Sequence, residues 1–196
     1  MIWKIVAVSV LAVFYAIYLG KMLAQRQKGI QTDQIARGKE RGRRYTVELL
    51  MKLATYSVVA VELLSICLDW SLFHGPVRVA GLVLGILGDI VFAVSVWTMR
   101  DSWRAGIAEQ DKTELITGGI YQFSRNPAFL GFDLMYIGVL LLYGNLLTLS
   151  FSLFAMMMLH LQILQEERFL ASTFGEPYRE YCRRVFRYLG RRKEHK

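Results

Sequence analysis

The sequence predicts an all-α integral membrane protein with five transmembrane helices in a single domain. Three observations point to this class: 54% of the 196 residues are hydrophobic, mean hydropathy is +0.32, and the apolar residues are gathered in long blocks. The blocks run over about 2–22, 47–70, 77–99, 127–143 and 146–173. A helix needs about 20 apolar residues to cross a bilayer, so the block at 127–143 is close to the minimum and the other four are long enough.

The first block begins at Ile2 and is predicted to be an uncleaved anchor. A removed secretory signal is the alternative, but the block is long, its start carries only Lys4, and no small-residue cleavage site follows. The next stretch, residues 24–44, is expected to be a cytosolic loop or an interfacial helix, with lipid headgroup contact as an alternative role. Its basic residues are Arg26, Lys28, Arg37, Lys39, Arg41, Arg43 and Arg44.

The second and third blocks contain carboxyl groups that are costly in lipid. Glu62 lies near the middle of the second block, and Asp89 follows Gly81 and Gly85 at four-residue spacing in the third, with Gly88 beside them. Small residues at this spacing allow two membrane helices to pack closely. We therefore expect both carboxyl groups to face the bundle or water, in either a functional or a structural role.

The fourth block opens with Asn126-Pro127, which predicts the start of a helix because Asn favours the N-cap and Pro the first helical position. Gly144-Asn145 predicts a tight turn that makes the fourth and fifth helices antiparallel neighbours. The fifth helix is expected to stop at Phe174-Gly175, before Pro177.

Basic residues crowd three places: residues 24–44, residues 100–125 and the tail after Glu167. The connections 71–76 and 144–145 have none. Five spans place the three basic segments on one side, so the positive-inside rule predicts an outside N-terminus and a cytosolic C-terminus. We expect a multi-pass protein of the cell inner membrane.

The net charge is +8 and the pI is about 9.6. In a soluble protein these values would suggest nucleic-acid binding, but in a membrane protein they are explained by basic loops that lie against anionic lipid. No nucleic-acid partner is therefore expected. The two cysteines, Cys67 and Cys182, form no CxxC or Cys/His pattern. The histidines are scattered, and no metal site is expected.

The predicted topology brings a cytosolic pocket together from the C-terminal half, lined by Tyr121, Asn126, Phe129 and Glu166. It offers a helix N-terminus for an anion, a carboxylate for an ammonium and aromatic rings for a cation. A zwitterionic amino acid with a sulfonium, such as S-adenosylmethionine (SAM), fits these groups. Belt aromatics and a solvated helix end are the structural alternative.

A series of short motifs follows the third block. They are Trp103, LITGGIY (115–121), SRNPAFLG (124–131), EERFL (166–170), Phe174-Gly175, Tyr178, Tyr181 and Val185. In this order they resemble the isoprenylcysteine carboxyl methyltransferase family and the related phospholipid N-methyltransferases. The resemblance covers the C-terminal half and leaves the first two spans without a signal.

The resemblance implies an SAM-dependent methyltransferase acting on a lipophilic acceptor. It implies that residues 100–196 are the SAM-binding catalytic half, that residues 1–99 supply three spans with the basic loop 24–44, and that residues 1–196 are one membrane domain. The implied cofactor residues are Thr113, Glu114, Leu115, Ile116, Tyr121, Arg125, Asn126, Pro127, Ala128 and Phe129, with Glu166 on the ammonium. Arg125 matches the family's Arg; an ion pair or a headgroup contact is its structural role.

The acceptor is less well defined by the motifs. Gln162 stands where the carboxyl methyltransferases typically have Arg, and Gln cannot make a charge-assisted bidentate pair with a carboxylate. Gln162 and Glu167 are the predicted substrate-binding residues; His160, Asp133 and Glu167 lie near enough to be considered as a base. Three alternatives stay open: an N-methyltransferase of phospholipid or another amphipathic amine, an NADPH-dependent membrane reductase of related fold, and a non-enzymatic membrane scaffold.

Overall fold

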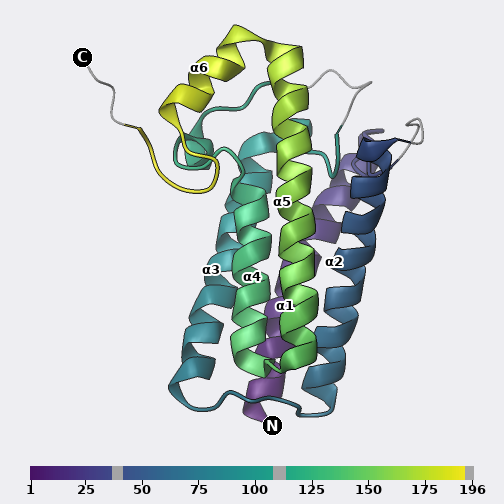
Figure 1. Cartoon of the computed structure of the whole chain (residues 1–196), viewed down its shortest axis with the longest axis vertical. Coiled ribbons are helices and arrows are strands. Elements are labelled where there is room, and N and C mark those ends of the chain that lie inside the picture. Colours follow the sequence, from purple (N-terminus) through teal and green to yellow (C-terminus); the bar gives the residue numbers. More distant parts are fainter. Residues whose placement is uncertain (37–41, 108–113, 193–196) are drawn as a thin grey trace.

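A computed structural model describes residues 1–36, 42–107 and 114–192 of the chain. Five long helices stand side by side in one bundle (Figure 1). They are α1 (Ile2–Gln27), α2 (Arg43–Cys67), α3 (Pro76–Met99), α4 (Pro127–Tyr143) and α5 (Leu146–Phe174). Two 3₁₀ turns, η1 (Arg100–Ser102) and η2 (Gly119–Gln122), and a short helix α6 (Glu176–Arg184) complete the described structure, which contains no β-strand.

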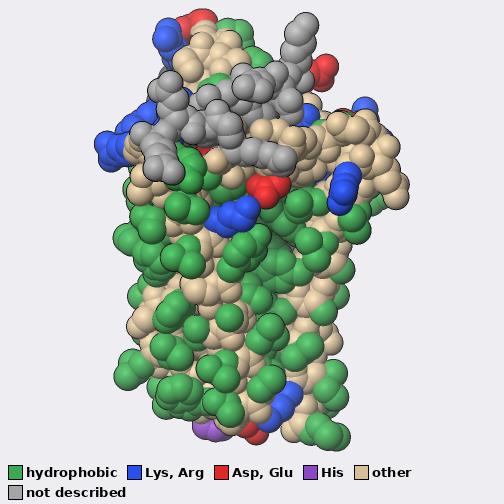
Figure 2. All heavy atoms as spheres, turned by 90° about the vertical axis from the view of Figure 1, so that its right-hand side faces the viewer, with side chains coloured by type: hydrophobic (Ala, Val, Ile, Leu, Met, Phe, Trp, Pro, Cys, Tyr) green, Lys and Arg blue, Asp and Glu red, His purple; other side chains and the backbone are tan. Residues whose placement is uncertain are grey.

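The predicted all-α membrane class is confirmed, with four helices of spanning length in the described residues. α1, α2, α3 and α5 are each long and apolar enough to cross a bilayer, which makes the chain a multi-pass membrane protein. α4 is apolar but only 17 residues long. Figure 2 shows hydrophobic side chains along most of one face of the bundle, with most charged side chains near one end.

The bundle separates two kinds of connection (Figure 1). The N-terminus, the α2–α3 link and the α4–α5 turn lie at one end, while α6 and the described parts of the three basic segments lie at the other. The α4–α5 turn forms as predicted because the Asn145 side chain accepts hydrogen bonds from the backbone N–H groups of Leu147 and Thr148, both at 3.0 Å. α5 ends at Phe174, and the C-cap residue Gly175 has a φ of +59°, which favours glycine.

Glycines bring α3 and α4 into close contact, as the small-residue spacing predicts. A Cβ added at Gly138 of α4 would lie 2.5 Å from the backbone nitrogen of Gly85 on α3. One added at Gly88 would lie 2.7 Å from the backbone nitrogen of Met135. Neither position has room for a side chain, so these glycines set the distance between the helices.

Glu62 and Asp89 face the bundle, as expected. Glu62 is 0% exposed and Asp89 is 7% exposed. The apolar core beside them is rich in aromatic residues: the rings of Phe14 and Phe92 stack with centroids 4.5 Å apart, and Phe132 meets Phe92 edge-on at 5.2 Å.

Candidate functional site

A pocket lies at the charged end of the bundle, between the start of α4, the end of α5 and the segment that follows η1. We call it the interfacial pocket. Most of the predicted cofactor residues line it, namely Glu114, Leu115, Ile116, Tyr121, Arg125, Asn126, Ala128, Phe129 and Glu166. Pro127 is buried at the first position of α4 and is not part of the lining, and Thr113 lies outside the described residues.

The segment that carries Tyr121 is held by α6. The Tyr181 hydroxyl donates to the Tyr121 carbonyl at 2.6 Å and lies 3.3 Å from the Ser124 carbonyl. Burial raises the pKa of both Tyr121 and Tyr181, so both hydroxyls are neutral at physiological pH and can donate hydrogen bonds. Gly119 makes the bend before Tyr121 with a φ of +59°, which favours glycine.

The Asn126 side chain does not cap α4, which corrects the sequence prediction. Its backbone occupies the N-cap position, but its amide donates to the Glu167 carboxylate at 3.1 Å and to the Arg187 carbonyl at 3.2 Å. The start of α4 therefore has no side-chain cap, in contrast to α5, where Asn145 supplies one. The first N–H groups of α4 stay available beside the interfacial pocket, with the positive end of the helix dipole.

Glu167 belongs to an ion-pair cluster. It lines neither the interfacial pocket nor the deeper pocket that is described next. Its carboxylate lies 3.1 Å from Arg125 and 2.8 Å from Arg187, and the Glu167 and Arg125 side chains are only 11% and 12% exposed. The hydrogen bond from Arg187 to Glu167 raises the pKa of that guanidinium. Glu167 thus links the residues before α4, α5 and the C-terminal tail.

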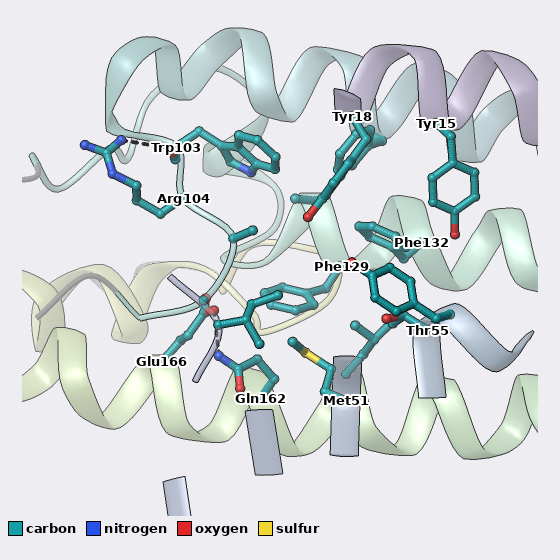
Figure 3. Close-up of a pocket in the computed structure, with 17 residues that line it drawn as sticks. Tyr15, Tyr18, Met51, Thr55, Trp103, Arg104, Phe129, Phe132, Gln162 and Glu166 are labelled. Atoms are coloured by element: carbon teal, nitrogen blue, oxygen red, sulfur yellow. Dashed lines mark hydrogen bonds between the residues drawn. The ribbon is translucent and has the colours of Figure 1, made fainter. Parts of the chain in front are cut away.

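A second pocket extends from the interfacial pocket into the membrane-spanning part of the bundle; we call it the membrane pocket (Figure 3). The two pockets share Trp103, Arg104, Ala128, Phe129 and Glu166. Deeper, the lining is mostly apolar and aromatic and comes from α1 to α5, including Tyr15, Tyr18, Met51, Thr55, Phe92, Phe132 and Leu159. The motifs missed the α1 and α2 residues; only the spacing of Tyr15 and Tyr18, which places them on one helix face, could have indicated them.

Gln162 lines the membrane pocket, and its side-chain oxygen accepts no hydrogen bond from a described residue. The side chain is fully buried, and its amide nitrogen donates to the Glu166 carboxylate at 3.1 Å. Because a carboxylate only accepts hydrogen bonds, the nitrogen must face Glu166 and the oxygen must face away. This oxygen has no hydrogen-bond partner within the described residues.

Arg104 is the one basic residue among the described residues that line the membrane pocket. One of its guanidinium nitrogens donates to the carbonyls of Asp101 and Trp103, at 2.6 and 2.8 Å. In Figure 3 the guanidinium points away from the pocket. Glu166 and Gln162 line the same pocket.

The residues considered as a base are placed elsewhere. His160 meets the hydroxyl of Tyr188 through Nδ1, and neither His160 nor Asp133 lines either pocket. The described residues contain no group of three or more His, Cys, Asp or Glu suited to a metal ion.

These features define a helical multi-pass membrane protein with a composite site, in which an interfacial pocket and an aromatic pocket within the bundle share five lining residues. The chain belongs to the phospholipid methyltransferase family, whose model matches residues 77–177. This match includes α3, α4, α5 and most of the interfacial pocket.

Curated relatives are protein-S-isoprenylcysteine O-methyltransferases. A probable one from Oryza sativa subsp. indica is 33% identical over 112 residues, which cover 56% of this chain and 59% of that protein. The protein-S-isoprenylcysteine O-methyltransferase of Schizosaccharomyces pombe is 39% identical over 72 residues, which cover 36% of this chain and 30% of that protein. The enzyme of that name from Saccharomyces cerevisiae is 31% identical over 120 residues, which cover 60% of this chain and 50% of that protein. The chain thus matches less than two thirds of the length of each, and the resemblance predicted from the motifs is confirmed.

Proposed function

We propose that this protein is an integral membrane methyltransferase that takes SAM from the cytosol and methylates a lipophilic acceptor drawn from the bilayer. One observation carries the proposal: the interfacial pocket, which holds the motif residues, adjoins the membrane pocket and shares Phe129 and Glu166 with it. A water-soluble cofactor and a lipophilic acceptor can therefore meet at one point of the chain. The relatives' names support the same class of reaction.

The residues of the interfacial pocket fit SAM. The uncapped start of α4 suits the carboxylate of its amino acid part, and Glu166 suits the ammonium. Trp103, Tyr121 and Phe129 offer aromatic faces to the adenine and the sulfonium. When bound, SAM supplies an electrophilic methyl group on sulfur. The chain's part is then to align the acceptor with that group and to exclude water, which the apolar lining of the membrane pocket does.

The acceptor is proposed to enter from the side. Tyr56 of α2 lines the membrane pocket and is also 65% exposed on the outer surface of the bundle, so the pocket reaches the face that lipid would cover. An amphipathic acceptor could keep its head near Glu166 while its apolar part lies among Tyr18, Met51 and Phe132.

A carboxylate acceptor, as in the relatives' names, is the first candidate, and an N-methylation reaction is the second. The Gln162 oxygen favours the second, because it can accept a hydrogen bond from an amine N–H but would lie unpaired against a carboxylate. Glu166 beside it would also repel a carboxylate and attract an ammonium.

Gln162→Arg is therefore expected to shift selectivity toward carboxylates. A buried guanidinium can hold a carboxylate in a bidentate pair and repels an ammonium, so we expect a change of roughly 10-fold or more in the ratio of kcat/KM values for a carboxylate and an amine acceptor of equal chain length. Gln162→Met, which is similar in size and uncharged, is the matched control. A shift toward the amine in the arginine variant would mean that residue 162 does not face the acceptor.

We propose further that all five long helices span the membrane. α4 would be about 26 Å long, slightly short of the hydrocarbon core, and the tight α4–α5 turn would lie at its outer boundary. The positive-inside rule then places the N-terminus outside and the C-terminus in the cytosol. The membrane in this proposal is the cell inner membrane.

The two native cysteines test this topology. Cys67 is exposed at the end of α2, and Cys182 lies in α6 at the opposite end of the bundle. A membrane-impermeant maleimide applied to spheroplasts is expected to label Cys67, whereas Cys182 should react only after permeabilisation. Cys67→Ser and Cys182→Ser variants assign each signal. Labelling of Cys182 in intact spheroplasts would reverse the orientation.

Methyl transfer itself tests the function. Protein in nanodiscs is incubated with SAM carrying a tritiated methyl group and with S-prenylated cysteine or phosphatidylethanolamine, and the lipid extract is counted. Label in either product supports the proposal and identifies the acceptor chemistry. Consumption of NADPH without methyl transfer would favour the reductase alternative, and the absence of any cofactor binding would favour a scaffold.

A further inference from the structure

A groove between α1 and α3 lies outside the composite site, near the charged end of the bundle. We call it the α1–α3 groove. One wall comes from α1 and the residue that follows it, namely Ile17, Lys21 and Lys28. The other wall comes from α3 and η1, namely Ala93, Val96, Trp97, Arg100 and Asp101. None of these residues lines the interfacial pocket or the membrane pocket.

Both walls change from apolar to basic in the same direction. On α1, Lys21 follows Ile17 by four residues, or about 6 Å along the axis; on α3, Arg100 follows Ala93 by seven, or about 10 Å. Residues at these spacings lie on one face of a helix. Because α1 and α3 both end at the charged end of the bundle, the basic residue is in each case the one nearer to water.

Positive charge exceeds negative charge in the groove. The Lys28 ammonium lies 3.0 and 2.9 Å from the two carboxylate oxygens of Asp101, so these two residues neutralise each other. Lys21 and Arg100 add two further cations, and the described lining contains no second carboxyl group. The groove therefore complements an anion.

Trp97 marks the depth of the groove in the membrane. It lines the groove one turn before the end of α3, and its side chain is 81% exposed. Exposed tryptophan on a spanning helix is typical of the membrane–water interface, where lipid headgroups lie. The basic part of the groove is thus at the level of the headgroups, and its apolar part is at the level of the acyl chains.

We propose that the α1–α3 groove binds an anionic phospholipid of the surrounding membrane, with the lipid phosphate between Lys21 and Arg100. An acyl chain then lies along Ile17, Ala93 and Trp97. Basic pockets between membrane helices suit such lipids, because charge attraction to the headgroup adds to apolar contact with the chain. A water-soluble phosphate would use only the basic half of the groove. This inference goes beyond the proposed function, since the groove is separate from the composite site.

Quenching of Trp97 fluorescence by brominated lipid measures which lipid occupies the groove. The protein is placed in vesicles that contain equal amounts of phosphatidylglycerol and phosphatidylcholine, with brominated acyl chains on one lipid or the other. The Trp97 signal is the difference between the wild type and Trp97→Phe, which subtracts the other tryptophans. We expect phosphatidylglycerol to be preferred at Trp97 by at least about 5-fold, because two cations of the groove face its phosphate.

Variants assign the preference to the groove. Lys21→Gln combined with Arg100→Gln should bring the two lipids to within about 2-fold of equal occupancy. Arg179→Gln combined with Arg183→Gln is the matched control, because it removes two exposed cations of α6 outside the groove, and it should keep the preference. Asp101→Asn makes the groove more positive and should increase the preference.

Three results would overturn the site. They are equal quenching by both lipids in the wild type, the full preference in a folded Lys21→Gln/Arg100→Gln protein, and an equal loss in the α6 control, which would assign the preference to net charge alone. If the groove variant does not fold, Asp101→Asn decides, and a preference no greater than that of the wild type would count against the site. None of these measurements uses SAM or methyl transfer, so their outcome is independent of the proposed function.

Discussion

Glu166→Ala is expected to abolish SAM binding, with a loss of affinity of at least about 100-fold, while the protein remains folded in detergent. Glu166 is the acidic residue shared by the interfacial and membrane pockets. Truncating one member of a buried charge pair costs about 2–5 kcal/mol, because the other charge is left without a partner. Calorimetry of SAM binding to the variant and the wild type measures the effect, and the thermal unfolding temperature reports folding.

Glu176→Ala is the matched control for this substitution. Glu176 also lies near the charged end of the bundle, but its carboxylate is 59% exposed and pairs with the exposed Arg183 at 2.8 Å. Its loss should leave SAM affinity within about 2-fold of the wild type, because an exposed ion pair contributes little. If the Glu166→Ala variant binds SAM as tightly as the wild type, the Glu166 carboxylate does not contact the cofactor.

Gly138→Leu is expected to separate α3 from α4 and to prevent the protein from folding into a stable, monodisperse species. Even a Cβ at this position would lie 2.5 Å from the Gly85 nitrogen and 2.8 Å from the Gly81 carbonyl oxygen, both of them backbone atoms that cannot move aside alone. We expect a loss of several kcal/mol of stability, as for severe overpacking of a core. Size-exclusion profiles and unfolding temperatures in detergent measure it.

Gly20→Leu is the control for the effect of a leucine in a membrane helix. Gly20 lies in α1, and nothing approaches a Cβ placed there within 4 Å. This variant should behave as the wild type does. A Gly138→Leu protein with the wild-type profile would show that α3 and α4 do not depend on their close approach.

The sequence was sufficient for the helices because hydrophobic length and end signals are local. The blocks at 77–99 and 127–143 correspond closely to α3 and α4, and the Gly144-Asn145 turn and the Gly175 stop occur where the residues predict them. α1 continues to Gln27, beyond the apolar block, since a helix can extend into polar sequence once it leaves lipid.

The role of Asn126 could not be predicted from its neighbours. Its amide is taken by Glu167 and Arg187, which are 41 and 61 residues further along the chain. A local capping rule assigns the side-chain oxygen to the helix start, but the amide nitrogen donates to a buried carboxylate and to a carbonyl of the tail, and these bonds fix the orientation of the side chain. Glu167 is part of the same long-range cluster, which the motif did not predict; its contact with the substrate stays a prediction.

The lining of the membrane pocket could not be fully predicted from the sequence, for a different reason. Its motif residues, such as Phe129 and Glu166, could be found, but Tyr18, Met51 and Thr55 come from spans without a motif. In a membrane helix, residues that face lipid and residues that face a pocket are equally apolar, so hydrophobicity does not separate them. Only the packing of α1 and α2 against α4 and α5 shows which residues line the cavity.

The central claim is that the interfacial pocket binds SAM, and calorimetric titration of the purified wild-type protein tests it most directly. SAM, its demethylated product S-adenosylhomocysteine, and NADPH are each titrated into protein in detergent whose folding has been verified. We predict saturable binding of the first two with Kd values in the micromolar range, and no binding of NADPH. Binding of NADPH alone, or of none of the three, would contradict the assignment.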